Sequence, residues 1–327
     1  MIKFAILGPG KIARCMAQAV TGTEGVVSYA VASRDMERAK DFANEWGFEK
    51  AYGSYEEMLA DTEVNLVYVA TPHSFHYEHA KLCLDYGKHV LVEKPFTVNS
   101  KQAKELLAYA KEKGCLIAEA MWTRFMPSRQ MIDDILASGV IGTVSSVTAN
   151  LGYEMTHKER LVEPHLAGGA LLDVGIYPIN FARMIAKEEV VKITSDAVMS
   201  SKGVDLVNSV TLTFKNNILA ILHSSMLADT DRLGVVYGDK GYLEVQNINN
   251  CEEIRVYNNA REMTAKYQVP KQINGYEYEV IACKNAIESV ALECKQMPHS
   301  ETIYMLEIMD AVRKQWNMKY PFEELDE

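Results

Sequence analysis

The sequence lacks the features of a membrane protein or a nucleic-acid-binding protein. Its 327 residues carry a formal net charge of −10. DNA, RNA and anionic membranes select basic surfaces, so the charge argues against all three as partners. No apolar run reaches the roughly eighteen residues of a transmembrane helix. The N-terminal residues lead directly into a strand pattern rather than a signal peptide, and we therefore expect a cytoplasmic protein.

The sequence also lacks a metal-binding or disulfide pattern. Its six cysteines form no C-x-x-C pair and no cluster with zinc spacing. Each lies in an apolar or helical stretch, which predicts reduced and mostly buried thiols. His73, His76 and His79 lie close together, but their spacing does not match H-E-x-x-H. We expect no metal site.

The composition is that of an ordinary globular protein, with 48% hydrophobic and 24% charged residues. No internal repeat or low-complexity linker is present. A chain of 327 residues is longer than a single core usually supports, so two domains are expected.

Residues 1–120 alternate predicted strands and helices. The predicted strands cover residues 2–7, 26–32, 64–70, 89–93 and 115–120. The predicted helices cover residues 12–20, 37–46, 74–86 and 100–113, with a capping-box start for a further short helix at residues 54–57. Apolar strands that alternate with helices predict a doubly wound parallel sheet, the Rossmann fold.

A glycine turn joins the first predicted strand to the first predicted helix. Gly8, Gly10 and Ala13 give the pattern G-x-G-x-x-A. In such a turn the first glycine permits the bend, the second lets a pyrophosphate approach the backbone, and the alanine lets helix and strand pack closely. The helix N-terminus then favours the negative charge. The pattern predicts a dinucleotide site; an ordinary strand-to-helix turn is the alternative.

The end of the second strand bears on which nucleotide binds. An NAD site commonly has Asp or Glu here, whereas this chain reads Ser33, Arg34 and Asp35, followed by Arg38. A hydroxyl and two guanidinium groups suit a 2′-phosphate, and we expect NADP. Asp35 keeps NAD as an alternative, as does pairing of Arg38 with Asp35 or Glu37.

The pattern changes after residue 120. A helix near 128–138 is followed by predicted strands at 144–152, 190–200, 207–215, 218–227, 232–237, 241–245 and 253–257, several of them joined by short polar turns. Helices are predicted at 276–296 and 301–317. We therefore predict an α+β domain over residues 121–327 with an open, mostly antiparallel sheet, whose last helices are free to pack back on the first domain.

Glu93, Lys94 and Pro95 follow the strand at residues 89–93, at the carboxyl edge of the sheet where ligands bind. With the glycine turn, Thr71-Pro72 and His76, this tripeptide resembles the Gfo/Idh/MocA oxidoreductases. The resemblance covers nearly the whole chain. Residues 119–125 and 168–177 resemble most the branch of dimeric dihydrodiol dehydrogenases and NADP-dependent xylose dehydrogenases. Tyr177 stands where inositol dehydrogenases have histidine, so inositol oxidation is less favoured.

The resemblance implies a set of site residues. The cofactor residues would be Gly8, Gly10, Lys11, Ile12, Ala13, Ser33, Arg34, Arg38, Thr71, Pro72, His76, Glu93, Lys94, Trp122 and Arg124. Substrate contacts would come from Lys94, Trp122, Phe125, His157, His165 and Tyr177. Trp122 could instead fill the domain junction, and the two histidines could be ordinary surface residues.

The catalytic residues are predicted to be Lys94, Asp173 and Tyr177. Tyr177 accepts the proton of the substrate hydroxyl. Lys94 favours its phenolate, because a nearby cation lowers the pKa of a tyrosine. Asp173 lies four residues before Tyr177 and shares its face in a helix, where it orients one or both. Pro178 would then lie in a first turn or at a kink, because it lacks an N–H group.

The predicted function is hydride transfer between a nicotinamide and a secondary alcohol or ketone of a sugar, cyclitol or cyclic diol. A keto-sugar reductase, a non-catalytic nucleotide-sensing regulator and a glycosidase with tightly bound NAD are the alternatives. Lys94, Asp173 and Tyr177 argue against the regulator, because a sensor needs the nucleotide site alone. The open sheet face predicts a homodimer or homotetramer.

Overall fold

The computed structural model describes residues 1–323, which divide into two compact units. Unit 1 comprises residues 1–126 and 271–304, and unit 2 comprises residues 127–270 together with the chain from Met305 onward. The division predicted between residues 120 and 121 falls close to the end of the first stretch of unit 1. Residues 271–304 come from the C-terminal segment and belong to unit 1.

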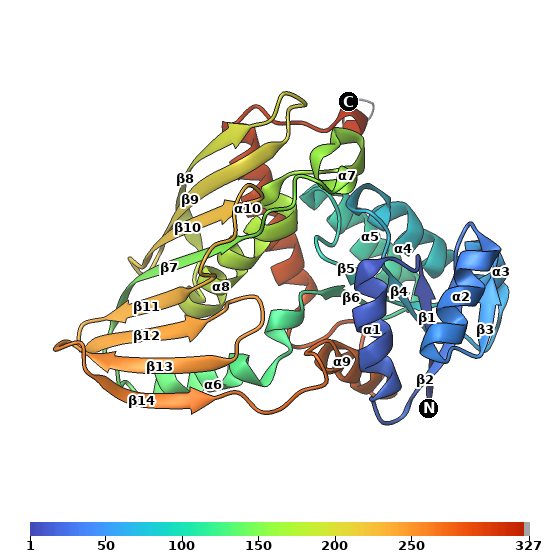
Figure 1. Ribbon diagram of the computed structural model, residues 1–327, viewed down its shortest axis with the longest axis horizontal. Coiled ribbons are helices and arrows are strands. Elements are labelled where there is room, and N and C mark those ends of the chain that lie inside the picture. The colour runs from blue at the N-terminus through green and yellow to red at the C-terminus, as the bar shows by residue number, and fades with distance from the viewer. Residues whose placement is uncertain (324–327) are drawn as a thin grey trace. The chain divides into compact units, whose positions relative to one another are not determined.

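Unit 1 contains a six-stranded parallel sheet in the order β3-β2-β1-β4-β5-β6 (Figure 1). Its strands are β1 (Ile2–Leu7), β2 (Val26–Ala32), β3 (Lys50–Tyr52), β4 (Leu66–Val69), β5 (His89–Glu93) and β6 (Ile117–Ala120). The strand order reverses between β1 and β4, and β1 pairs in parallel with both β2 and β4. A doubly wound sheet binds ligands beyond the carboxyl ends of its strands at such a switch point.

The helices of unit 1 have clear local signals. They are α1 (Lys11–Thr21), α2 (Met36–Trp46), α3 (Tyr55–Ala60), α4 (His76–Asp85), α5 (Ser100–Lys113) and α9 (Glu277–Glu288). Asp35, Ser54 and Asn99 cap α2, α3 and α5 through side-chain oxygens, because the first N–H groups of a helix have no partner within it. Gly47 and Gly114 end α2 and α5 in the left-handed conformation.

Unit 2 contains an eight-stranded sheet in the order β14-β13-β12-β11-β7-β10-β9-β8, antiparallel except where β10 pairs with β7. The strands are β7 (Val144–Gly152), β8 (Val190–Met199), β9 (Asp205–Phe214), β10 (Leu219–Ser225), β11 (Gly234–Gly238), β12 (Gly241–Gln246), β13 (Glu253–Asn258) and β14 (Met263–Gln268). The helices are α6 (Pro127–Ala137), α7 (Glu159–Val162), α8 (Ile176–Ala186) and α10 (His299–Gln315), the last of which begins in unit 1.

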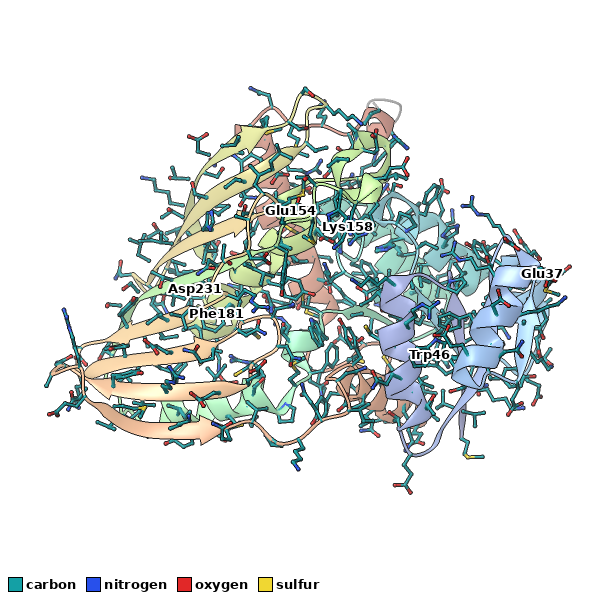
Figure 2. All side chains as sticks on the ribbon, in the orientation of Figure 1. Glu37, Trp46, Glu154, Lys158, Phe181 and Asp231 are labelled. Carbon is teal, nitrogen blue, oxygen red and sulfur yellow. The ribbon has the colours of Figure 1, made fainter. Side chains whose placement is uncertain are left out.

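The core of unit 2 lies between the sheet and α8, which packs against β7, β10 and β11. Phe181 points from α8 toward the strands (Figure 2), and its ring lies 2.7 Å from the place where a Cβ on Gly234 would be. In the described chain, α6, α8 and α10 lie on one side of this sheet (Figure 1). Buried residues alternate with exposed residues along β10 and with half-buried residues along β12, which fits a sheet with one covered face.

The fold class is confirmed, but several elements differ from the prediction. The strands β3 and β14 and the short helix α7 were not predicted, and α8 was considered only as the setting of Asp173 and Tyr177. The helix predicted at 276–296 is wrong beyond residue 288: Ser289 ends α9, Val290 has a φ of 57°, and Cys294 forms an isolated bridge with Met297. Residues 290–297 instead form an irregular segment in which Cys294 and Met297 are buried and Val290 is exposed.

Candidate functional site

The glycine turn after β1 has the geometry of a phosphate-binding loop. Gly8 has a φ of +94°, a region that L side chains rarely adopt, and its N–H donates to the Ala32 carbonyl over 3.1 Å. The Gly10 N–H donates to the Gly8 carbonyl over 2.8 Å. A Cβ on Gly8 would lie 3.0 Å from Thr71 Cγ2, so a side chain there would fill the bend. The turn therefore exposes bare backbone at the switch point.

The helix that follows the turn begins without a capping side chain. Gly10 is the N-cap of α1 and makes no side-chain capping bond, which leaves backbone N–H groups available for an anion. Ala13 is fully buried, as the motif requires, while Lys11 is exposed and Ile12 is half-buried. These four predicted residues therefore lie together at one helix end.

The residues after β2 form a second part of this edge. Asp35 Oδ1 accepts the N–H groups of Glu37 and Arg38, over 3.0 and 3.4 Å, as the cap of α2. Ser33 Oγ accepts the Asp35 N–H over 3.2 Å. Arg38 donates through Nη2 to the Pro9 carbonyl over 3.0 Å, which brings its guanidinium to the glycine turn. Glu37 pairs instead with Lys40, at 2.8 Å.

Three aromatic side chains that the sequence analysis did not assign to the site lie beside this edge. The Tyr55 and His79 rings meet edge-on at 5.0 Å between centroids, and Phe75 stacks on His79 at 5.6 Å. Burial, followed by the positive charge of Arg34, lowers the pKa of His79 to about 4. Burial raises the pKa of Tyr55, while the charges of Arg34 and Arg38 oppose that rise. An uncharged aromatic surface therefore lies beside two exposed arginines.

His76 joins two loops of unit 1. Its ring is fully buried, with Nδ1 at 2.7 Å from the Pro95 carbonyl and Nε2 at 2.8 Å from the Thr71 carbonyl. Burial lowers its pKa to about 3. The cofactor role of His76 stays a prediction. Its ring contacts the backbone carbonyls of Thr71 and Pro95, so it holds these two loops and does not itself face solvent.

Glu93 and Lys94 lie at the end of β5. The buried Glu93 carboxylate accepts from the Tyr68 hydroxyl through Oε1, and from the Lys94 N–H through Oε2 over 3.1 Å. The peptide bond between Lys94 and Pro95 is cis. The Lys94 side chain is partly exposed. Glu93 therefore fixes the backbone of Lys94 through a hydrogen bond between adjacent residues.

Trp122, Arg124 and Phe125 follow β6. The Trp122 indole is buried and stacks on Tyr276, with ring centroids 4.2 Å apart and planes 9° apart. Arg124 pairs with Glu301 at 2.7 Å, and Phe125 is buried. One face of the indole is therefore covered by the protein, and the charge of Arg124 is balanced within unit 1.

Asp173 and Tyr177 lie on one continuous helical segment of unit 2. A π-helical turn, Leu171–Gly175, leads directly into α8 at Ile176, and both side chains are buried. Asp173 accepts from Arg160 Nη1 over 3.0 Å. Pro178 lies in the first turn of α8, after the π-helical turn. Such turns often occur at functional sites.

His157 and His165 lie on the segment between β7 and the π-helical turn, as Glu154 and Lys158 do (Figure 2). Their side chains are 65% and 64% exposed, and they lie 3.3 Å from Glu154 and 3.7 Å from Glu163. Lys94 belongs to unit 1, whereas both histidines, Asp173 and Tyr177 belong to unit 2. The grouping of Lys94 with Asp173 and Tyr177 therefore stays a prediction.

Family models match both parts of the chain. Residues 2–121 match the oxidoreductase family with an NAD-binding Rossmann fold, and residues 130–244 match the Gfo/Idh/MocA C-terminal domain. The chain belongs to the Gfo/Idh/MocA oxidoreductase family. The predicted resemblance is therefore confirmed, and so is the class of NAD(P)-dependent oxidoreductase.

Known relatives of this family resemble the chain over most of its length. The human trans-1,2-dihydrobenzene-1,2-diol dehydrogenase is 33% identical over 298 residues, which are 89% of each chain. The protein of the same name from Xenopus tropicalis is 31% identical over 330 residues, covering 98% of this chain and 99% of its own.

Solved structures share the whole fold. KijD10, a 3-ketoreductase from Actinomadura kijaniata solved in complex with NADP, has a TM-score of 0.83 and 26% identity, covering 96% of this chain and 97% of its own. The aldose-aldose oxidoreductase from Caulobacter crescentus has a TM-score of 0.88 at 22% identity, covering 96% of each chain. The second likeness bears on the fold alone.

No helix in the described residues is long and apolar enough to cross a membrane. All six cysteines are free thiols, five of them buried. This agrees with the expected reduced and mostly buried thiols.

Proposed function

We propose that this family member is an NADP(H)-dependent oxidoreductase that interconverts a secondary alcohol and a ketone on a sugar, cyclitol or cyclic diol. The observation that carries the cofactor part is the hydrogen bond from Arg38 to the Pro9 carbonyl, which holds a guanidinium at the glycine turn. The relatives named as dihydrodiol dehydrogenases, and the NADP complex of KijD10, support the substrate and cofactor classes.

The residues of unit 1 fit a dinucleotide. A Cβ would fill the bend at Gly8, and α1 begins with uncapped N–H groups, so the turn suits a pyrophosphate. Ser33, Arg34 and Arg38 would hold a 2′-phosphate, because Arg keeps its charge and offers a planar fork of donors. Asp35 already accepts two backbone N–H groups, which makes it a weaker partner for a ribose hydroxyl.

Proton transfer is assigned to Tyr177. When bound, the nicotinamide supplies the hydride acceptor or donor. Tyr177 takes the proton of the substrate hydroxyl in oxidation and returns it in reduction, and Asp173 orients it from one helical turn earlier. Arg160 balances the buried Asp173 carboxylate. Lys94 favours the phenolate form and positions the hydroxyl, because a cation near a phenol stabilises its ionised form.

The cofactor assignment is tested with Arg34→Ala and Arg38→Ala. Each lost charge-assisted contact costs about 1.5–3 kcal/mol, so the double variant should bind NADP(H) at least about 10²-fold more weakly. NAD(H) binding should change little. Arg14→Ala is the control, because Arg14 lies on α1 but pairs with Glu45 on the surface. Equal weakening of both cofactors would refute the preference.

The catalytic assignment is tested with Tyr177→Phe, which should lower kcat by about 10²–10⁴-fold with cofactor affinity nearly unchanged. The rise of the oxidation rate with pH should vanish in this variant. Tyr267→Phe, on strand β14 of the same unit, is the control. A cofactor complex with the Tyr177 oxygen more than about 6 Å from both Lys94 Nζ and the nicotinamide C4 would exclude the role. His165 or His157 would then be the next candidates.

The substrate and direction are tested with a panel of aldoses, cyclitols, trans-dihydrodiols and keto-sugars, followed by absorbance with NADP and with NADPH. The likeness to a 3-ketoreductase makes ketone reduction a direction to test equally. Tight cofactor binding without turnover of any member would instead favour the nucleotide-sensing regulator.

We also propose a homodimer or homotetramer formed through the uncovered face of the unit 2 sheet. The register places a row of side chains across neighbouring strands, formed by Tyr257, Tyr242, Tyr237, Ser146 and Leu219. The Tyr257 ring stacks on Tyr242, and the Tyr237 ring lies tilted against Tyr242. Ile221, two residues along β10, is 52% exposed. Light scattering should show a monomer for Ile221→Lys if this face is the interface.

A cytoplasmic location is proposed as well, which the free thiols support because they persist in reducing compartments.

A further inference from the structure

We propose that Asp205, at the start of β9, is a positioning residue of the reaction that holds the helical turn carrying Asp173 and Tyr177. The inference rests on the proposed role of Tyr177. Asp205 is fully buried, and its place in the sequence gives no local reason for a carboxylate in the core.

Asp205 supplies the cap that the helical segment lacks. Ala170, the N-cap of the π-helical turn, makes no side-chain capping bond. The Leu171 N–H donates instead to Asp205 Oδ2, over 2.8 Å. A carboxylate at a helix N-terminus is favoured both by the hydrogen bond and by the helix dipole. The start of the segment is therefore fixed from another strand.

Two further polar residues fix Asp205 itself. Asn208 donates through Nδ2 to Asp205 Oδ2 over 2.7 Å, and Asn208 Oδ1 accepts from Ser224 Oγ over 2.8 Å. All three side chains are buried. The ionised Asp205 carboxylate can only accept, so it requires the NH2 group of Asn208 to face it, and the Ser224 hydroxyl donates to the amide oxygen. The chain of hydrogen bonds runs from β10 through β9 to the helical segment.

The segment lies directly against this chain of hydrogen bonds. Gly169 has a φ of +123°, and a Cβ there would lie 2.3 Å from Asp205 Oδ1. A Cβ on Gly175 would lie 2.9 Å from Ser224 Oγ. At Gly169 and Gly175, on either side of Asp173, the backbone packs directly against Asp205 and Ser224, because glycine has no side chain to separate them. A shift of Asp205 therefore moves the backbone of Asp173. Tyr177 follows one turn later.

The charge of Asp205 adds a pH dependence to this contact. Burial raises its pKa to about 6, while hydrogen bonds from Asn208 and Leu171 and the charge of Arg313 oppose the rise. The titratable groups that face it are Arg313 and Tyr320. Arg313 lies over the Tyr320 ring and pairs with Glu323, and the Tyr320 hydroxyl donates to the Gly168 carbonyl over 2.7 Å. Protonation of Asp205 below about pH 6 removes the charge that caps the segment.

The test compares Asp205→Asn with Asp205→Ala. The asparagine keeps an acceptor for Leu171 and Asn208 but has no charge, whereas the alanine removes both. A misplacement of about 1 Å costs about 10²-fold in rate, so we expect kcat to fall about tenfold in the first variant and about 10²-fold in the second. NADP(H) affinity should stay within about twofold of the parent, because the predicted cofactor residues that bind phosphate lie in unit 1.

The pH profile separates positioning from a merely structural role. The parent should lose kcat as the pH falls through about 6, and Asp205→Asn should lack this acid limb. Val210→Ala is the matched control: Val210 is a buried residue of the same strand, and its truncation should lower the melting temperature while keeping the acid limb and kcat. If Asp205→Ala does not fold, the asparagine variant carries the test.

An acid limb near pH 6 that persists in Asp205→Asn, or a kcat no lower than that of Val210→Ala, overturns the proposal. Hydrogen exchange provides a readout independent of turnover, because peptides from residues 170–177 should exchange faster in the Asp205 variants than in Val210→Ala. Faster exchange in the Asp205 variants, together with full activity of Tyr177→Phe, would show that the cap is real but that Tyr177 is not the proton carrier. The proposed catalytic role of Tyr177 would then fail, and with it the part of Asp205 in the reaction.

Discussion

Gly8 is the residue of the glycine turn whose replacement gives the sharpest prediction. Its φ of +94° places it in the region that glycine adopts without strain, and its carbonyl and N–H hold the turn to Gly10 and β2. Gly8→Ala adds a methyl group that the fold opposes in two ways. The backbone becomes strained, and the new Cβ lies 3.0 Å from Thr71 Cγ2.

The magnitude follows from these two effects. An L side chain in a left-handed conformation costs about 1–2 kcal/mol. The contact with Thr71 requires a shift of a few tenths of an ångström in a close-packed region, which adds about 1 kcal/mol. The free energy of unfolding of unit 1 should therefore fall by about 2–3 kcal/mol.

Gly47→Ala is the matched control. Gly47 also has a positive φ, of 72°, but a Cβ there meets nothing within 4 Å, and the residue ends α2. This variant should cost about 1–2 kcal/mol, the backbone strain of an L side chain in the left-handed conformation. The two substitutions thus share the backbone strain and differ in the contact with Thr71.

The assay measures urea unfolding together with a titration of NADPH, followed by the fluorescence of its dihydronicotinamide ring. Gly8→Ala should weaken cofactor binding at least tenfold, because relief of the contact displaces the backbone that would face the pyrophosphate. Gly47→Ala should leave the affinity within about twofold. Equal affinities of the two variants would refute the assignment of this turn to the cofactor, whatever the stabilities show.

Two predictions concern buried or bridging carboxylates of unit 1. Asp61 accepts from the hydroxyls of Tyr29 and Tyr52 and pairs with Lys50; although burial opposes it, these hydrogen bonds lower the pKa of Asp61. A lowered folded pKa gives stability that is present above the ordinary value of 3.8 and lost as the pH falls through the folded pKa. Asp61→Asn should therefore cost about 1–3 kcal/mol at pH 7 and somewhat less at pH 3, by urea unfolding. Burial raises the pKa of Glu119 to about 7 from an ordinary 4.5. A raised folded pKa gives stability that is present below pH 4.5 and lost as the pH rises to 7. Relative to Glu119→Gln, the free energy of unfolding of the parent should therefore fall by up to about 3 kcal/mol between pH 5 and 8. Parallel curves of unfolding free energy against pH for the two proteins would contradict this prediction.

The local pattern of the sequence was enough to predict the Rossmann fold and its glycine turn. Apolar strands that alternate with capped helices have one stable arrangement, a parallel sheet covered on both faces, and the short spacing from Gly8 to Ala13 is part of a single turn. The spacing of Asp173 and Tyr177 predicted a shared face on the condition that their segment is helical, and the structure has a continuous helical segment there. The sequence also showed which functional groups the predicted site contains, because arginine, lysine and tyrosine side chains can each take part in only a few kinds of reaction.

The tertiary structure alone decided what surrounds those residues. Three contacts join separate segments of the chain: His76 with the Pro95 carbonyl, Trp122 with Tyr276, and Asp205 with Leu171. No periodicity records such contacts, because the packing of whole elements sets them and the side chains then adapt. The early end of α9 at Glu288 has the same origin: residues 290–297 are apolar enough for a helix, but the fold holds Val290 at a positive φ and pairs Cys294 with Met297.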